Sequence, residues 1–227
     1  MKYSEFEKIL SPARMERYLI ASENNTRRAM TLYRLNLSLS QEFFTVISCF
    51  EITLRNKIDA VCISSLGDNC LRDSVRSGGI FDNEFCFKMQ KGIRDAINKL
   101  NERCTHNKLV AEFGFGFWRY LFAQYQFNAT GKILLKVFPE KPKSSEMKQY
   151  NQRYIFNKLM KINNFRNRIA HHEPICFVEN EAIKNSEYAM QHYGIILQLF
   201  KWMNVNEQAL LCGIDHISKV CYKIDNL

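Results

Sequence analysis

The stretch NNFRNRIAHHEPI, residues 163 to 175, holds the side chains of this chain best suited to proton transfer and phosphate chemistry. It places two arginines, an asparagine and two adjacent histidines in one short segment that ends beside a proline. A histidine that titrates near neutral pH can give or take a proton. An arginine can hold a phosphate and the negative charge that develops on it. His171 and Arg166 are therefore candidates for these two tasks.

An apolar helical stripe leads into this stretch, and the spacing of threes and fours puts Arg166 on it. The stripe consists of Ile155, Leu159, Ile162, Arg166 and Ile169. The pattern predicts that Arg166 lies on the core side, where an unpaired charge is costly. Arg166 should then face a cleft or a carboxylate such as Glu51. The alternatives are that Arg166 extends to solvent or forms a structural ion pair.

The two histidines are expected in the last turn of a helix that covers about residues 145 to 172. Pro174 disfavours helical geometry at the residue before it, which ends the helix there. The helix macrodipole favours cations at this end and so favours protonated imidazoles. Three other roles stay open for His171 and His172: a helix cap, a structural hydrogen-bonding pair, or metal ligands. Adjacent histidines on a helix point about 100° apart, which disfavours a shared metal.

The spacing within the motif sets a geometric condition on any shared site. Asn167 lies four residues before His171, so it can orient that ring on the same helix face. Arg166 lies five residues before His171, about 140° around an ideal helix. The two can act together only if the last turn is distorted or a second subunit completes the site. The motif therefore predicts a cleft at a helix pair or at a dimer interface.

Positive charge is concentrated around the same region. The formal net charge of the chain is +9, and between residues 141 and 172 eight Lys and Arg side chains face only one acidic residue, with aromatic residues interleaved. Clustered cations and aromatic faces suit RNA, although a solvated helix face has the same composition. The candidates for RNA contact are Lys148, Arg153, Lys158, Lys161 and Arg168.

Composition predicts one compact, helical domain over residues 1–227. Apolar residues make up 46%, which is enough for a core. No apolar run reaches the roughly 20 residues needed to cross a bilayer, and the start has no apolar signal core, so we expect a cytoplasmic protein without membrane contact. None of the eight cysteines forms a C-x-x-C pair, so we expect reduced thiols, no metal and no cofactor.

Helical spacing dominates the chain, and breaks are few. Ser11-Pro12 predicts a helix start, and Thr26 is expected to cap the next helix. A further helix from Ser40 should bury a stripe that we identify as Phe43, Ile47, Phe50, Leu54, Ile58 and Val61. The glycine-containing stretch around residues 66–84 predicts a loop or mobile insertion. More helices are expected over about 85–103, 109–127, 181–203 and 206–211.

Five segments, taken together and in this order, resemble the Abi-like (abortive infection) family, which looks like a branch of the HEPN superfamily. They are SPARMERYL, MTLYRLNLSLS, FEITLRNKI, AEFGFGFWRYLF and RNRIAHHEPI, and they cover most of residues 11 to 180. The superfamily motif is an arginine, usually a polar residue next, and a histidine four to six positions on. Arg166, Asn167 and His171 match it, and His172 fits the permitted spacing too.

The resemblance implies an all-α, HEPN-like helical bundle that dimerises and cleaves RNA without a metal. Carried over to this chain, His171 is the general acid or base, Arg166 the phosphate clamp and Asn167 the polar helper, with His172 as the second candidate for proton transfer. The LRN block places Arg55 and Asn56 among the family's matching residues. We expect a core-facing Glu51–Arg55 pair that supports the motif helix.

The expected function is therefore that of a ribonuclease toxin in bacterial anti-phage defence. The expected partners are RNA as substrate, a second copy of the chain, and a regulatory RNA or protein antitoxin. Two alternatives come from other classes of protein. One is an RNA-binding module without catalysis, in which the histidines only cap a helix. The other is a helical protein-interaction module, in which the aromatic GFGFW segment forms an interface.

Overall fold

The computed structural model describes all residues, 1–227, and the chain is all-α, which confirms the predicted class. Twelve α-helices and three short 3-10 helices (η1–η3) account for its regular structure, and the sole β feature is an isolated bridge between Phe177 and Lys184. No helix combines the length and the hydropathy needed to cross a bilayer.

Contacts divide the chain into two compact units. Unit 1 consists of Met1–Ser48, Asn164–Leu197 and Gln208–Leu227. Unit 2 consists of Cys49–Asn163 and Gln198–Glu207. Three long helices contribute residues to both units, and these are α3 (Thr26–Leu66), α9 (Gln152–Ala170) and α10 (Glu187–Trp202). The expectation of one domain over residues 1–227 stays a prediction.

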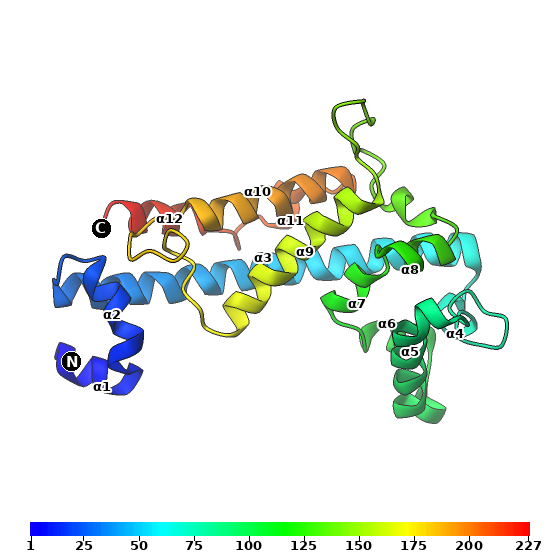
Figure 1. Cartoon of the computed structure of the whole chain (residues 1–227), viewed down its shortest axis with the longest axis horizontal. Helices are drawn as coiled ribbons and strands as arrows, with labels where there is room; N and C mark the ends of the chain where they lie inside the picture. The colour runs from blue at the N-terminus through cyan, green and yellow to red at the C-terminus, as the bar shows by residue number, and fades with distance from the viewer. The chain divides into compact units, whose positions relative to one another are not determined.

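Helix α3 is a single helix of 41 residues, where the sequence pattern predicted two (Figure 1). It contains neither proline nor glycine, so nothing in its backbone forces a break. Asn25, rather than the predicted Thr26, caps it, because the Asn25 Oδ1 accepts from the backbone N–H groups of Arg27 and Arg28 at 3.1 Å each. Its predicted stripe is buried from Phe43 to Ile58, whereas Val61 is half-buried.

In unit 1, the N-terminal helices α1 (Tyr3–Leu10) and α2 (Pro12–Ile20) meet at a sharp turn (Figure 1). Ser11 makes the turn with a positive φ of 81°, and its hydroxyl accepts from the Arg14 backbone N–H, which confirms the predicted helix start. The unit also contains the start of α10, most of α11 (Glu207–Leu210) and all of α12 (Ile217–Asp225). Neither α1 nor α12 was predicted from the sequence.

Unit 2 is built from shorter elements. They are α4 (Cys70–Asp73), η1 (Glu84–Cys86), α5 (Phe87–Leu100), η2 (Asn101–Arg103), α6 (His106–Ala111), α7 (Phe115–Tyr120), α8 (Gln124–Ala129) and η3 (Ile133–Val137). The helix expected over 85–103 is confirmed, with 3-10 turns at both ends. The helix expected over 109–127 is instead broken into α6, α7 and α8. Gly114 has an extended backbone and directly precedes α7, so it separates α7 from α6.

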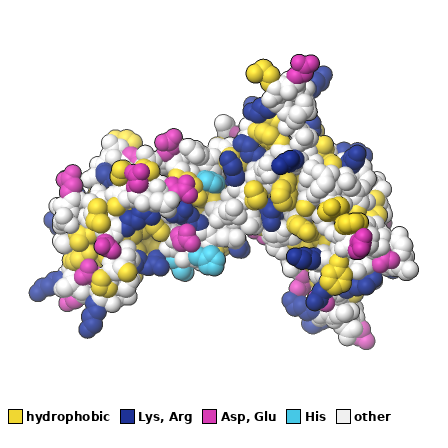
Figure 2. All heavy atoms as spheres, in the orientation of Figure 1, with side chains coloured by type: hydrophobic (Ala, Val, Ile, Leu, Met, Phe, Trp, Pro, Cys, Tyr) yellow, Lys and Arg dark blue, Asp and Glu magenta, His cyan; other side chains and the backbone are white.

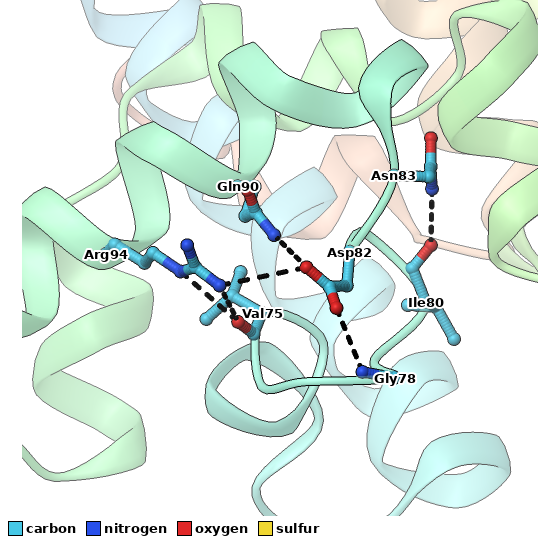
Figure 3. Close-up of polar contacts among 7 residues, drawn as sticks. All are labelled: Val75, Gly78, Ile80, Asp82, Asn83, Gln90 and Arg94. Atoms are coloured by element: carbon cyan, nitrogen blue, oxygen red, sulfur yellow. Dashed lines mark hydrogen bonds and ion pairs between the residues drawn. The ribbon is translucent and has the colours of Figure 1, made fainter.

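The stretch 66–84, predicted as a loop or mobile insertion, packs into unit 2. It contains α4, and its Leu71, Val75 and Phe81 are buried. Figure 3 shows the polar contacts that organise it: Asp82 accepts from the Gly78 backbone N–H at 3.0 Å and from the Gln90 amide at 2.7 Å. These hydrogen bonds hold the pKa of the Asp82 carboxyl below its usual value.

Gly79 shows how tightly that stretch folds back on α4. A Cβ at Gly79 would lie 2.5 Å from the carbonyl oxygens of Asp73 and Ser74, which is closer than real Cβ contacts. Glycine is therefore required at this close backbone approach.

Helix α9, which carries the histidine motif, covers Gln152–Ala170 rather than the predicted 145–172. Asn151 caps it, since its Oδ1 accepts from the Tyr154 backbone N–H at 3.1 Å. The serines before it form their own turn, in which the Ser144 Oγ accepts from the Tyr150 backbone N–H and the Ser145 Oγ from that of Lys148. Those local hydrogen bonds compete with the helix and delay its start.

Candidate active site

Arg166 lies at the surface, so its predicted core-side position is wrong. The buried stripe of α9 is Ile155, Leu159, Ile162, Phe165 and Ile169. Phe165 also satisfies the spacing of threes and fours, and burying its ring avoids the cost of burying a guanidinium. Phe165 makes an edge-to-face contact with Phe43 of α3 at 4.8 Å and stacks on His192 of α10 at 4.4 Å.

The helix end has the hydrogen bonds of a Schellman motif. The backbone N–H of His172 donates to the Ile169 carbonyl at 3.0 Å, and that of Glu173 to the Arg168 carbonyl at 3.0 Å. His172 holds the left-handed position of the motif, with φ of 58°, where glycine is the usual residue. The two histidines therefore lie just beyond the last helical residue, Ala170, instead of inside the last turn as predicted.

Three of the predicted catalytic side chains are free to meet a substrate. Arg166, Asn167 and His171 are exposed, and none of these side chains forms a hydrogen bond or an ion pair within the chain. Asn167 is linked to His171 only through the backbone, where its carbonyl accepts from the His171 N–H at 2.9 Å. That helical hydrogen bond shows that the helix continues through the His171 backbone nitrogen. Arg166 and His171 of one chain therefore project about 140° apart.

Arg168, the other arginine of the motif, is engaged in holding the helix end. Its Nε donates to the Pro174 carbonyl at 3.0 Å, and its guanidinium lies 5.2 Å from the centre of the Tyr188 ring. Its Nε also lies 3.6 Å from the Glu173 carboxylate. These contacts close the turn after α9 onto α10. The RNA-binding role expected for Arg168 stays a prediction.

Two arginines of α2 complete the surroundings of the histidines, and the sequence analysis did not single them out. The Arg14 Nη1 donates to the His172 carbonyl at 2.8 Å. A cavity of about 440 Å³ opens between α2 and the turn after α9. It is lined by Ser11, Ala13, Arg14, Arg17, Tyr18, His172, Glu173 and Pro174. Figure 2 shows histidine side chains at the surface near Lys, Arg and carboxylate groups.

Arg17 anchors the loop that follows the motif. Its Nε donates to the Glu181 carbonyl at 2.8 Å and its Nη2 to the Val178 carbonyl at 2.7 Å. Its guanidinium also lies 4.5 Å from the centre of the Phe177 ring. Arg17 thus fixes one wall of the cavity, whereas Arg14, which is exposed, keeps donors available to a ligand.

The remaining predicted RNA contacts lie in unit 2. Lys148, Arg153 and Lys161 are exposed, and Lys158 is half-buried. Burial and the neighbouring lysines lower the pKa of Lys158, whereas hydrogen bonding to Tyr150 and the nearby Tyr154 raise that of Lys148.

Two of these lysines belong to an aromatic–lysine cluster, which we define as Lys148, Tyr150, Tyr154, Lys158 and Trp202. The Lys148 Nζ lies 5.1 Å from the centre of the Tyr150 ring, and the Lys158 Nζ lies 5.5 Å from that of Tyr154. The Tyr150 and Trp202 rings meet edge to face at 5.6 Å. The cluster therefore combines cations with aromatic surface, as nucleic-acid sites do.

The residues expected to support the motif helix also belong to unit 2. The predicted Glu51–Arg55 ion pair is not formed, and the Arg55 Nε instead donates to the Asn56 Oδ1 at 3.3 Å. Glu51 and Arg55 are half-buried and Asn56 is exposed. Glu51 and Arg55 lie four residues apart on α3, and an ion pair at that spacing in contact with water contributes little to stability. The absence of the pair fits this small gain. Any supporting role of these three residues stays a prediction.

No family model matches this chain, and neither a curated protein nor a solved structure does. Any function must therefore be argued from the site itself. In unit 1, the site combines an unpaired guanidinium, an exposed imidazole and a cavity with arginines on its wall. Such groups can bind a phosphodiester and exchange a proton with it.

Proposed function

We propose that this protein is a metal-independent RNA endonuclease that uses Arg166 and His171. The observation that carries the proposal is that both side chains are exposed and unpaired in unit 1, and that His171 directly precedes His172, which lines the cavity together with Arg14 and Arg17. An exposed arginine can bind a phosphate, and a histidine can give or take a proton near neutral pH. The resemblance of the Arg166–His171 motif to the HEPN superfamily points the same way.

The proposed reaction is attack of the ribose 2′-oxygen on the adjacent phosphorus. The 2′-O–P bond forms, the P–O5′ bond breaks, and the products end in a 2′,3′-cyclic phosphate and a 5′-hydroxyl. His171 removes the proton from the 2′-hydroxyl or delivers one to the leaving 5′-oxygen. Arg166 binds the phosphate oxygens and stabilises the charge that builds up on them. Asn167 and His172 are the assisting groups in this scheme.

The helix geometry supports an active site shared between two copies of the chain. The Arg166 and His171 side chains of one chain project about 140° apart around the helix axis. They therefore point in different directions. A two-fold axis beside the end of α9 would bring the Arg166 of one copy toward the His171 of the other. We therefore propose a homodimer, held inactive in the cell by an RNA or protein partner, with a role in defence against phage.

Expression in a bacterial host tests the proposal. Wild-type protein should arrest growth and fragment cellular RNA, and His171→Ala should do neither while it accumulates to the same level. Fragments should carry cyclic phosphate and 5′-hydroxyl ends. The matched control is His216→Ala, an exposed histidine outside the motif, which should behave as the wild type. Equal RNA fragmentation by His171→Ala would remove His171 from the mechanism.

The aromatic–lysine cluster favours a second function, RNA binding without cleavage. Lysines next to Tyr150, Tyr154 and Trp202 suit single-stranded RNA. Under this alternative, Lys148→Ala would weaken a salt-dependent association with RNA, and no cleavage product would form under any condition. Under the nuclease proposal, the same substitution weakens binding and slows cleavage, but the end groups of the product stay the same.

A further inference from the structure

A second group of chemically capable side chains lies in unit 2, outside the candidate active site. One ligand atom each from Asp59, Cys70 and His106 lies within 4.8 Å of the other two. The His106 Nε2 is 2.7 Å from the Asp59 Oδ1. Asp59 belongs to α3, Cys70 opens α4 and His106 opens α6, so three separate elements converge here.

Cys62 adds a fourth donor to this group. It lies three residues after Asp59 on α3, so both side chains occupy the same helix face. Cys62 and Cys70 both line a small cavity of about 10 Å³ whose walls are mostly apolar and include Leu66, Phe81 and Leu121. The donor set therefore consists of two thiols, an imidazole and a carboxylate.

The cluster is largely shielded from solvent, and one nitrogen of the His106 ring has no partner in the protein. This atom, Nδ1, is buried and has no hydrogen-bond partner. The His106 and Asp59 side chains are only 14% and 17% exposed. Low exposure is what a closed structural metal site requires, and the Nε2 atom, which faces Asp59, is the ring nitrogen placed to share a ligand with that carboxylate.

A cysteine nucleophile activated by a His–Asp pair would use the same residue types, but the geometry disfavours it. In such a relay the carboxylate and the nucleophile contact opposite nitrogens of the imidazole, so the ring separates them. Here the ligand atoms of Asp59, Cys70 and His106 all lie within 4.8 Å of one another, so the three side chains converge instead of standing on opposite sides of the ring. Cys70 is also only 4% exposed, so a substrate could not reach its sulfur.

We propose that Asp59, Cys62, Cys70 and His106 form a structural zinc site. Thiolate, imidazole and carboxylate ligands in a four-coordinate, closed site are typical of Zn²⁺ in proteins. Both thiols release their protons to solvent when the metal binds. The ion fixes α4 and α6 to α3, and it takes no part in RNA cleavage, whose residues belong to unit 1.

No metal was expected from the sequence, because none of the eight cysteines forms a C-x-x-C pair. Here the pair is Asp59-x-x-Cys62, with a carboxylate where a zinc motif commonly has the first cysteine. The other two ligands, Cys70 and His106, are separated from it by whole elements of the fold. Only the packing of unit 2 shows that they meet.

Elemental analysis of the full chain, purified without chelators, tests the site. We expect about one zinc per chain for the wild type, and a loss of most of it in Cys70→Ser and in His106→Gln. The matched controls are Cys212→Ser and His216→Gln, which change an exposed cysteine and an exposed histidine outside the cluster and should keep the zinc. Full zinc content in both Cys70→Ser and His106→Gln would overturn the proposal.

A measurement on the wild type keeps the test decisive even where a variant does not fold. Co²⁺ added to metal-free, reduced protein should give the absorption bands of tetrahedral cobalt with thiolate ligands. Adding Zn²⁺ should then displace them and raise the melting temperature. Folded, reduced protein that binds neither ion, or that holds a Cys62–Cys70 disulfide in place of metal, would contradict the site.

Discussion

The Arg14 guanidinium of α2 donates a hydrogen bond of 2.8 Å to the backbone carbonyl of His172, 158 residues further along the chain. The contact involves the backbone of His172 and leaves its imidazole exposed. It brings an arginine of α2 to the helix end that already carries Arg166, Arg168 and His171. The surroundings of the motif in unit 1 are therefore more cationic than the motif alone, which favours an anionic substrate.

His172→Gly should stabilise the protein and leave cleavage largely intact. His172 holds a left-handed backbone conformation that glycine adopts without strain, so we expect the free energy of unfolding to rise by about 1 kcal/mol. The hydrogen bond from Arg14 persists because it uses the backbone carbonyl. Urea denaturation measures the first effect and an RNA cleavage assay the second. Loss of cleavage with a gain in stability would make His172 the group that transfers the proton.

Asn36→Ala should destabilise unit 1. Asn36 is 3% exposed, and its Oδ1 accepts from the backbone N–H of buried Ile175 at 2.9 Å. Removing the acceptor leaves that N–H unsatisfied, which costs about 1–3 kcal/mol. The control is Ser38→Ala, an exposed position of the same helix. Denaturation curves that coincide for the wild type and Asn36→Ala would show that water replaces the amide.

Arg17→Met should loosen the loop after the motif while it keeps the apolar part of the side chain. The variant loses the hydrogen bonds to the Val178 and Glu181 carbonyls, and we expect a cost of about 1.5–3 kcal/mol, typical of a hydrogen bond from a charged donor. Arg27→Met, at an exposed arginine of α3, is the control. Hydrogen exchange at residues 177–184 should speed up in the first variant alone. Unchanged exchange there would contradict the anchoring role of Arg17.

Stability should fall at alkaline pH, in part because of Cys176. Burial raises the pKa of this thiol from 9.0 to about 12. Above pH 9 the unfolded chain loses the proton while the folded chain keeps it, so unfolding becomes easier as pH rises. Between pH 9 and 12 the loss approaches about 1.4 kcal/mol per pH unit for this group. Denaturation of Cys176→Ala should show a shallower decline over that range, and an identical slope would contradict the assignment.

Apolar spacing alone predicted much of the helical framework. The buried face of α3 from Phe43 to Ile58 follows from this spacing, because apolar residues three and four positions apart all lie on one face of a helix. The same rule misplaced Arg166, since after Ile162 both Phe165 and Arg166 fit the spacing. Only the cost of burying a charge decides between them. The same cost led to the prediction of a cleft or a carboxylate partner for Arg166, whereas the fold meets it by burying Phe165 and exposing Arg166.

Other features depend on interactions that spacing does not contain. The start of α9 is set by the choice between Ser144, Ser145 and Asn151 as caps, and all three residue types can cap a helix. At the end of α9, His172 occupies the left-handed position where glycine is usual. The sequence therefore has no glycine there to indicate where the helix ends. Arg14 and the zinc ligands come from segments far apart in the sequence, and only tertiary packing brings them to their partners.

The most direct test of the central claim is cleavage of a short RNA by purified protein in the presence of EDTA, with the zinc content of each sample measured beforehand. We predict that wild-type protein yields 2′,3′-cyclic phosphate ends, that His171→Ala binds the RNA equally well without cutting it, and that a mixture of Arg166→Ala and His171→Ala chains regains part of the activity. Cleavage by His171→Ala at the wild-type rate, with folded protein and matched zinc content, would contradict the nuclease site.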